Sequence, residues 1–186
     1  MTGPWLFRYR TIVPLPIAAA VLALRPGASS LGLTAAGVAL TAAGELLRLW
    51  AVRHIGTISR TRSGRLGPLV TSGPFAFTRN PLYIGNIAIW TGFALAARLV
   101  WLAPAVIVLL AAEYHAIVRW EEQLLGSRLG DVYRAYMSRV PRWIPKLQAG
   151  TASGDGPMFS WRETLFSERG TLVAIGVGYL LIWLKG

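Results

Sequence analysis

Long apolar runs alternate with short arginine-rich segments along the whole chain. The apolar runs cover residues 12–24, 31–52, 82–97, 99–118 and 171–184. A helix of about 20 apolar residues spans the hydrocarbon core of a bilayer, and flanking aromatic residues extend a shorter run. The pattern therefore predicts an all-α, polytopic integral membrane protein with about five transmembrane helices.

The second apolar run carries residues that bring helices close together. Glu45 and Arg48 lie three positions apart near its end, where they can form an ion pair. Small side chains allow helix backbones to approach each other within a membrane. We expect the close-packing face of this helix to consist of Gly32, Ala35, Ala36, Ala39, Ala42 and Ala43.

The third and fourth runs are separated by Arg98 alone, which predicts a tight antiparallel hairpin. The fourth helix is expected to leave the membrane and to continue through Leu125. Because glycine weakens a helix interior, we expect interruptions at Gly126 and Gly130.

A short polar helix is predicted after these glycines, over residues 132–140. Asp131 is a suitable N-cap for it, since aspartate side chains accept hydrogen bonds from the first free N–H groups of a helix. The spacing of Tyr133 and Tyr136 places both tyrosines on one buried side.

We predict one membrane domain over residues 1–186. Its core, residues 66–146, contains the motifs described below. A linker rich in small residues and an aromatic interfacial segment occupy 147–169, and a last transmembrane helix occupies 170–186.

Charge sets the expected orientation. The chain has 186 residues, a net charge of +11, 54% hydrophobic residues and only 15% charged residues, where a soluble domain carries about 25%. Most arginines fall on one predicted side, which is the cytoplasmic side by the positive-inside rule. We therefore expect a cytoplasmic N-terminus, and cytoplasmic labelling of single cysteines at Ser63 and Ser153. Abundant alanine, arginine and glycine favour a bacterial inner membrane.

Composition excludes several kinds of chemistry. No cysteine is present, which excludes disulfides, thiolate metal sites and a cysteine nucleophile. The two histidines, His54 and His115, are far apart in sequence, and we predict no metal site. The basic charge is typical of a membrane topology signal, and no motif indicates a nucleic-acid partner.

Arg119, Glu121 and Glu122 are the candidate catalytic residues. His115, Arg119 and Glu122 follow helical spacing and form one polar stripe, with Glu121 on the neighbouring face. Carboxylates at a membrane boundary are costly unless they are paired or solvated. One interpretation is a pair of carboxylates that holds a cationic ligand, with an arginine for an anionic group. The alternative is an ordinary interfacial helix end with surface ion pairs.

A second group of candidates surrounds the third apolar run. Pro81 suits the first turn of a helix, so the N–H groups of that turn are available to a ligand. The tyrosines can stack on a nucleoside or lie among interfacial aromatic residues. The candidate cofactor-binding residues are Gly73, Phe75, Arg79, Asn80, Tyr83, Gly85, Glu121, Glu122, Tyr133 and Tyr136.

The order of these motifs resembles the superfamily of isoprenylcysteine carboxyl methyltransferases and phospholipid methyltransferases. The resemblance covers roughly residues 66–146. It is carried by Gly73-Pro74-Phe75, Arg79-Asn80-Pro81-Leu82-Tyr83-Ile84-Gly85, Glu121-Glu122, Gly130-Asp131-Val132-Tyr133-Arg134-Ala135-Tyr136 and Val140-Pro141.

The resemblance implies an integral membrane methyltransferase that uses S-adenosylmethionine, with a cofactor pocket on the cytoplasmic side. The family has histidine where this chain has Asn80, and asparagine hydrogen-bonds but does not titrate near neutral pH. The implied acceptor is lipid-like or small and apolar: a phospholipid amine, a prenylated thiol or carboxylate, or an apolar thiol.

Two other classes of protein remain open at this point. A sterol-reductase-like membrane enzyme would use NADPH and needs arginines for the 2′-phosphate. A non-enzymatic membrane scaffold would keep the motifs for structural reasons. The sequence does not predict the oligomeric state.

Overall fold

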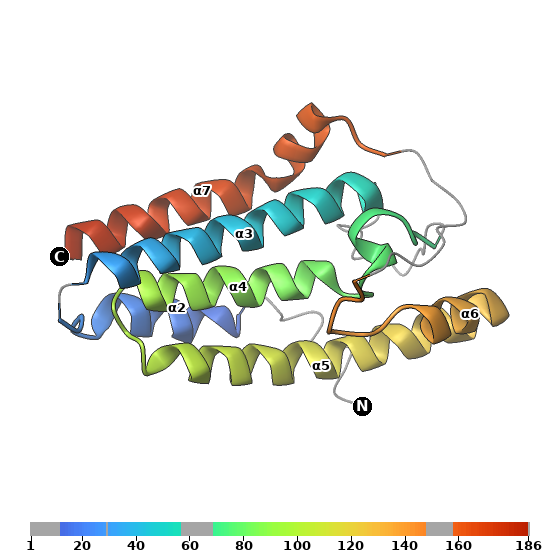
Figure 1. Cartoon of the computed structure of the whole chain (residues 1–186), viewed down its shortest axis with the longest axis horizontal. Helices are drawn as coiled ribbons and strands as arrows, with labels where there is room; N and C mark the ends of the chain where they lie inside the picture. The colour runs from blue at the N-terminus through green and yellow to red at the C-terminus, as the bar shows by residue number, and fades with distance from the viewer. Residues whose placement is uncertain (1–11, 29, 57–68, 148–157, 186) are drawn as a thin grey trace.

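The computed structural model describes residues 12–28, 30–56, 69–147 and 158–185, and this part of the chain contains helices and no strand (Figure 1). The prediction of an all-α protein is confirmed. The α-helices are α2 (Pro14–Ala23), α3 (Leu31–Ile55), α4 (Pro81–Ala96), α5 (Leu102–Leu129), α6 (Asp131–Arg139) and α7 (Trp161–Lys185), with the short 3-10 helix η2 (Gly73–Ala76) before α4.

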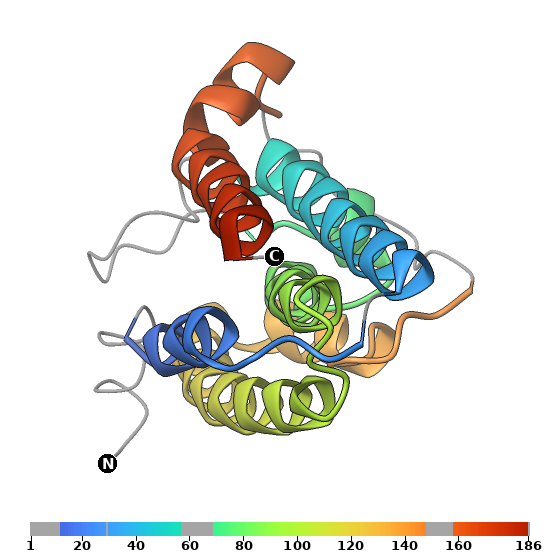
Figure 2. The ribbon, with the colours of Figure 1, turned by 90° about the vertical axis from the view of Figure 1, so that its left-hand side faces the viewer.

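Five of these helices lie roughly parallel or antiparallel to one another. In the end-on view α4 is central, with α3 and α7 on one side and α2 and α5 on the other (Figure 2). Among the described residues, α3, α5 and α7 are long and apolar enough to cross a membrane, whereas α2 and α4 have 10 and 16 residues. Five full spans therefore remain a prediction.

The tightest helix pair is α3 with α4, and glycines make the approach possible. A Cβ atom on Gly44 would meet the carbonyl oxygen of Gly85 at 2.7 Å, and one on Gly92 would meet Thr41 Oγ1 at 2.2 Å. Gly37, Thr41 and Gly44 are buried at this contact. The predicted face was wrong, because its members are all exposed: Gly32, Ala35, Ala36, Ala39, Ala42 and Ala43.

The expected hairpin joins α4 to α5. Arg98 has φ 61°, and the backbone N–H of Leu99 donates to the carbonyl of Ala94 at 2.9 Å, so the chain reverses within a few residues. The predicted interruption at Gly126 was wrong, since α5 is helical to Leu129. Gly130, with φ 54°, ends it.

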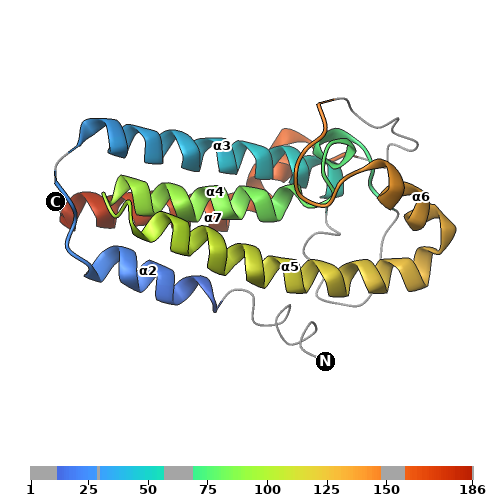
Figure 3. The same ribbon diagram turned by 60° about the horizontal axis from the view of Figure 1, so that its bottom comes forward.

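The short helix α6 folds back beside the end of α5 (Figure 3). Burial of Tyr133 and Tyr136 is confirmed. The predicted cap was wrong: Asp131 lies inside the first turn and accepts a hydrogen bond from Arg134 Nη2 at 2.6 Å, while Gly130 occupies the N-cap position.

The last helix, α7, begins at Trp161, ten positions before the apolar run, and is continuous to Lys185. The predicted Glu45–Arg48 ion pair is present at 3.4 Å. Arg48 Nη2 also donates to Glu168 Oε2 at 2.5 Å, which joins α7 to α3. The Arg53 guanidinium lies 4.4 Å from the ring centroid of Trp161 and adds a second contact between the two helices.

Candidate functional site

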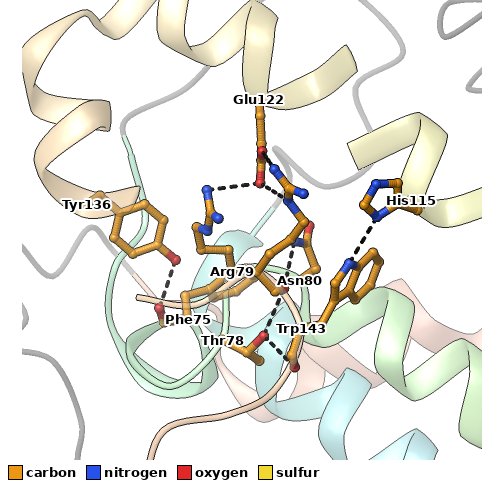
Figure 4. Close-up of polar contacts among 9 residues, drawn as sticks. Phe75, Thr78, Arg79, Asn80, His115, Glu122, Tyr136 and Trp143 are labelled. Atoms are coloured by element: carbon orange, nitrogen blue, oxygen red, sulfur yellow. Dashed lines mark hydrogen bonds and ion pairs between the residues drawn. The ribbon is translucent and has the colours of Figure 1, made fainter. Parts of the chain in front are cut away.

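The candidate site forms where the segment before α4 meets the segment after α6. The backbone N–H of Arg79 donates to the carbonyl of Pro141 at 2.9 Å, and that of Lys146 donates to the carbonyl of Phe77 at 3.0 Å. Two side chains add to this seam: Thr78 Oγ1 and Asn80 Nδ2 donate to the carbonyl of Arg142 at 3.2 and 3.0 Å (Figure 4). Segments about 60 residues apart are thereby joined.

Glu122 of α5 is the ionic centre of this junction. Its Oε1 lies 2.9 Å from Arg79 Nη1, and Arg142 reaches both of its oxygens, with Nε–Oε1 at 3.0 Å and Nη2–Oε2 at 2.7 Å. Such two-point contacts between guanidinium and carboxylate are among the stronger hydrogen bonds in proteins. The hydrogen bond to Glu122 raises the pKa of Arg142 above its usual value, with burial opposing the shift.

Glu121 faces α4 through Tyr83. The Tyr83 hydroxyl lies 3.2 Å from both carboxylate oxygens of Glu121. The ring of Tyr83 packs on the ring of Tyr114, with centroids 4.7 Å apart. Neighbouring carboxylates of α5 thus enter different contacts, one with arginines and one with a tyrosine.

The two tyrosines of α6 close the site from the other side. Tyr136 donates its hydroxyl to the carbonyl of Phe75 at 2.8 Å and so holds η2 against α6. Burial, followed by the negative charge of Glu122, raises the pKa of Tyr133 to about 12. Burial also raises the pKa of Tyr136. Both phenols are therefore neutral hydrogen-bonding groups at physiological pH.

The two candidate glycines occupy close contacts within the protein. Gly73 has φ 57°, and a Cβ atom there would lie 2.5 Å from His54 Nε2. Gly85 faces α3, where a Cβ atom would meet Arg48 Cγ at 2.6 Å. Gly85 is therefore explained by helix packing, whereas Gly73 shapes the backbone next to Phe75.

The structure brings most of the candidate residues together, with two exceptions. Arg79, Asn80, Glu122, Tyr133 and Tyr136 all contribute to the junction, and Tyr83 and Glu121 adjoin it on the α5 side. Gly85 lies at the α3–α4 contact, and Arg119 is exposed on α5. Sequence reasoning missed Arg142, Thr78 and Trp143. Their only signal was their position next to the motif segments.

An apolar groove of about 800 Å³ opens beside the junction. Its walls come mainly from α4 and α5, with Leu40 of α3 at one edge and His115 and Trp143 at the polar end. Trp143 Nε1 donates to His115 Nδ1 at 3.4 Å, and the two rings are stacked. Figure 4 shows this pair next to the contacts of Glu122.

A family model for phospholipid methyltransferase matches residues 33–131. The match covers more than half of the chain and includes α4, most of α3 and all of α5. The chain belongs to the phospholipid methyltransferase family. Together with the three long apolar helices, this makes it an integral membrane protein.

Two curated relatives of this phospholipid methyltransferase family member are metal-resistance proteins. It is 31% identical over 112 residues to the cobalt-zinc-cadmium resistance protein CzcN of Cupriavidus metallidurans, covering 60% of this chain and 47% of that protein. It is 31% identical over 100 residues to the nickel-cobalt-cadmium resistance protein NccN of Alcaligenes xylosoxydans xylosoxydans, covering 54% and 44%. The match thus spans about half the length of each relative. No solved structure matches the chain.

The donors and acceptors at the junction fit the methyl donor of the family. Arg79 is buried beside Glu122 and Tyr133, and its Nε makes no hydrogen bond to the described residues, so this nitrogen is the candidate donor for a carboxylate. Glu122 is paired with Arg79 and Arg142, whereas Glu121, hydrogen-bonded to the Tyr83 phenol, supplies negative charge for a cationic group. No group of three or more metal-ligating side chains occurs within the ranges that the structure describes, and we propose no metal site.

Proposed function

We propose that this protein is an S-adenosylmethionine-dependent methyltransferase whose acceptor partitions into the membrane. The observation that carries the proposal is the convergence of separate motif segments on Glu122. Arg79 comes before α4, Glu122 from α5 and Arg142 from the segment after α6. A family member that draws these three segments together at the end of its apolar helices has the arrangement expected of a cofactor pocket.

The roles of the residues follow from their charges and contacts. Arg79 Nε would bind the carboxylate of the cofactor, and Asn80 together with Tyr133 and Gly73–Phe75 would border its nucleoside. Glu121, held by Tyr83, would face the cationic part. The bound cofactor supplies an activated methyl group on a sulfonium. The protein then has to align the acceptor and exclude water, and no covalent enzyme intermediate is required.

Arg142 takes the place that sequence reasoning gave to Arg119. A catalytic role for Arg119 requires a polar partner or ligand, and its side chain is exposed on α5. Arg142 grips Glu122 through two nitrogens and fixes the carboxylate beside Arg79. We therefore assign Arg142 as a positioning residue and Arg119 as a surface charge.

The acceptor belongs to the apolar classes that the family includes, and we place the pocket at the cytoplasmic face of a bacterial inner membrane. The membrane helices and the adjoining apolar groove support a lipid-like or small apolar acceptor. The relatives carry metal-resistance names, and this chain spans only about half of them. The part of the chain that the structure describes holds no group of three metal-ligating side chains.

Cofactor binding is the decisive experiment. Purified protein in nanodiscs should bind S-adenosylhomocysteine in calorimetry and should not bind NADPH. Incubation with labelled S-adenosylmethionine and total bacterial lipid should then produce a labelled product. Binding of NADPH instead would show a reductase, and binding of neither would show a scaffold. Arg119→Gln is the matched control for substitutions of Glu122 and should bind like wild type, because this exposed arginine lies one helical turn from Glu122.

A further inference from the structure

The groove beside the junction has an apolar body and one polar end. Ile84, Ile87 and Ala88 of α4 and Ile107 and Ala111 of α5 form most of its walls. A volume of about 800 Å³ lies within the range of about 300–1,000 Å³ found for small-molecule sites. The groove is therefore large enough for one hydrocarbon chain with a small head group.

The polar end is the stacked pair His115 and Trp143. Trp143 Nε1 can only donate a hydrogen bond, and it points at His115 Nδ1 over 3.4 Å. The bond at one ring nitrogen of a histidine determines which nitrogen carries the proton. Neutral His115, which lines the groove, therefore carries its proton on Nε2 and has an N–H donor there.

This end of the groove adjoins the candidate site through the chain itself. Trp143 follows Arg142, which binds Glu122, and Ile84 follows Tyr83, which binds Glu121. His115 lies seven residues before Glu122, two turns earlier on the same side of α5. A molecule lying in the groove thus has its head next to the residues that we assign to the cofactor.

We propose that His115 is a specificity-determining residue: its Nε2–H binds the head of the methyl acceptor, whose apolar chain fills the groove. The head is an anionic sulfur or oxygen, a thiolate or a carboxylate, and is not an ammonium. This inference rests on the proposed function, because only a methyltransferase has a methyl acceptor. It concerns binding alone, so no bond is made or broken.

The chemistry of the lining selects between anionic and cationic heads. The described lining residues include no carboxylate, and the polar groups are the Thr91 hydroxyl, the His115 imidazole and the Trp143 indole. An ammonium head would lie against an N–H donor, and Glu122, two turns away on the same side of α5, is already paired with Arg79 and Arg142. A thiolate or carboxylate gains a charge-assisted hydrogen bond from the same N–H.

Competition for a photoreactive chain tests the proposal without any methyl transfer. Dodecanoate carrying a mid-chain diazirine is cross-linked to the protein in phosphatidylcholine nanodiscs at pH 8.5. Unlabelled dodecanoate, dodecanethiol, dodecylamine or methyl dodecanoate is added before irradiation as a competitor. We expect labelling of α4 and α5 peptides, and we expect dodecanoate, which is ionised, to compete about tenfold better than the amine, the ester or the thiol, which is largely protonated at this pH.

Variants separate recognition of the head from the shape of the groove. His115→Leu should abolish the preference for dodecanoate over its methyl ester, and His115→Gln, which restores an N–H donor, should recover part of it. Trp143→Phe keeps an aromatic ring but removes the hydrogen bond that fixes the tautomer of His115, so the preference for dodecanoate over its methyl ester should fall severalfold. Ala111→Leu fills the groove and should weaken all four competitors equally.

Several outcomes overturn the proposal. They are amine competition equal to that of dodecanoate, an unchanged preference in His115→Leu, and labelling confined to helices other than α4 and α5. S-adenosylhomocysteine binding is measured on the same samples. If wild-type protein shows the head preference but does not bind S-adenosylhomocysteine, the proposed function fails and the anion site stands. A His115 variant that still binds S-adenosylhomocysteine is folded, and its preference for dodecanoate over the methyl ester is then decisive.

Discussion

Glu122 is the residue on which the charges of the site depend most. Its side chain is only 11% exposed and lies between the guanidinium groups of Arg79 and Arg142. Removing one partner of a buried ion pair is costly, because the charges that remain are desolvated and unpaired. Glu121 has a neutral phenol as its hydrogen-bond partner, so the loss of its charge is less disruptive.

We predict that Glu122→Gln lowers S-adenosylhomocysteine affinity by roughly ten- to a hundredfold, the equivalent of about 1.5–3 kcal/mol for a charge-assisted hydrogen bond. Glutamine keeps the shape and removes the charge. Glu121→Gln should have a smaller effect, and Arg119→Gln should be close to wild type. Calorimetry in nanodiscs measures all three. Wild-type affinity in Glu122→Gln would remove this residue from the site.

Tyr133 gives the site a pH dependence in the alkaline range. Burial raises its pKa to about 12 in the folded protein, against about 10 in an unfolded chain. Above pH 10 the unfolded state loses the phenolic proton while the folded state keeps it. Folding stability contributed by the neutral phenol is therefore present below pH 10 and is lost as the pH rises toward 12.

We predict that Tyr133→Phe flattens the fall of thermal stability between pH 10 and 11. One such group changes the free energy of unfolding by about 1.4 kcal/mol per pH unit at most. Unfolding temperatures in detergent across this range make the measurement, with exposed Arg134→Gln as the control on the same helix. An equally steep fall in Tyr133→Phe would show that other groups dominate the alkaline transition.

Residue types at the site were predictable from the sequence, and their partners were not. The motifs singled out Arg79, Glu122 and the α6 tyrosines, all of which meet at the junction. The pairing of Glu122 with Arg142 in place of Arg119 depends on how the segment after α6 folds back to the start of α4. Helical spacing within α5 contains no information about that return.

At the scale of the elements, the contact of α3 with α4 positions the site. The start of α4 carries Asn80 and Tyr83, so any shift of α4 against α3 moves both. Gly44 and Gly85 form the close approach nearest to the site, with backbone atoms where a side chain would otherwise be. Packing at one turn of α4 thus affects the geometry of the junction one turn earlier.

We predict that Gly85→Ala destabilises the protein by about 1–3 kcal/mol, the usual cost of overpacking, and weakens S-adenosylhomocysteine binding. The new Cβ atom would meet Gly44 O at 2.7 Å, a backbone atom that cannot move without its helix. Gly176→Ala is the matched control, since nothing lies within 4 Å of that position in α7. Equal unfolding temperatures for the two variants would contradict the tight contact.

The sequence predicted the helices better than it predicted their faces. Apolar run length was sufficient to locate α3, α4 and α5. The face of α3 was wrong because the stripe of alanines lies on the exposed side of the helix, opposite Gly37, Thr41 and Gly44, so small side chains alone do not mark a contact. The informative positions in α3 were Gly37, Thr41 and Gly44, which follow one another at spacings of four and three residues. They become recognisable as a contact only beside Gly85 and Gly92, the facing glycines of α4.

At the scale of the whole molecule, the chain runs back and forth between two ends. One end holds the turn before α3, the α4–α5 hairpin and the end of α7, and the other holds η2, α6 and the start of α7 (Figures 1 and 3). The first end carries Arg25, Arg98 and Lys185, whereas the second is much richer in arginine. By the positive-inside rule, we expect the end that holds the candidate site to be cytoplasmic.

Cysteine accessibility tests this arrangement, and the absence of cysteine from the chain makes single labels unambiguous. The sites first chosen from the sequence, Ser63 and Ser153, lie outside the described residues, so exposed positions at the two ends replace them. We predict that Ser127→Cys and Ser160→Cys react with a membrane-impermeant maleimide only in inverted vesicles, and that Ala28→Cys and Val100→Cys react only in spheroplasts. The reason is that α3, α4, α5 and α7 each connect one end of the molecule to the other. Even α4, the shortest of the four with 16 residues, extends about 24 Å at about 1.5 Å per residue, so it separates the two ends by most of a membrane core. Labelling of Ser127→Cys and Ser160→Cys from opposite sides would contradict a common cytoplasmic end, and labelling of Val100→Cys from the cytoplasm would show that the α4–α5 hairpin does not cross the membrane.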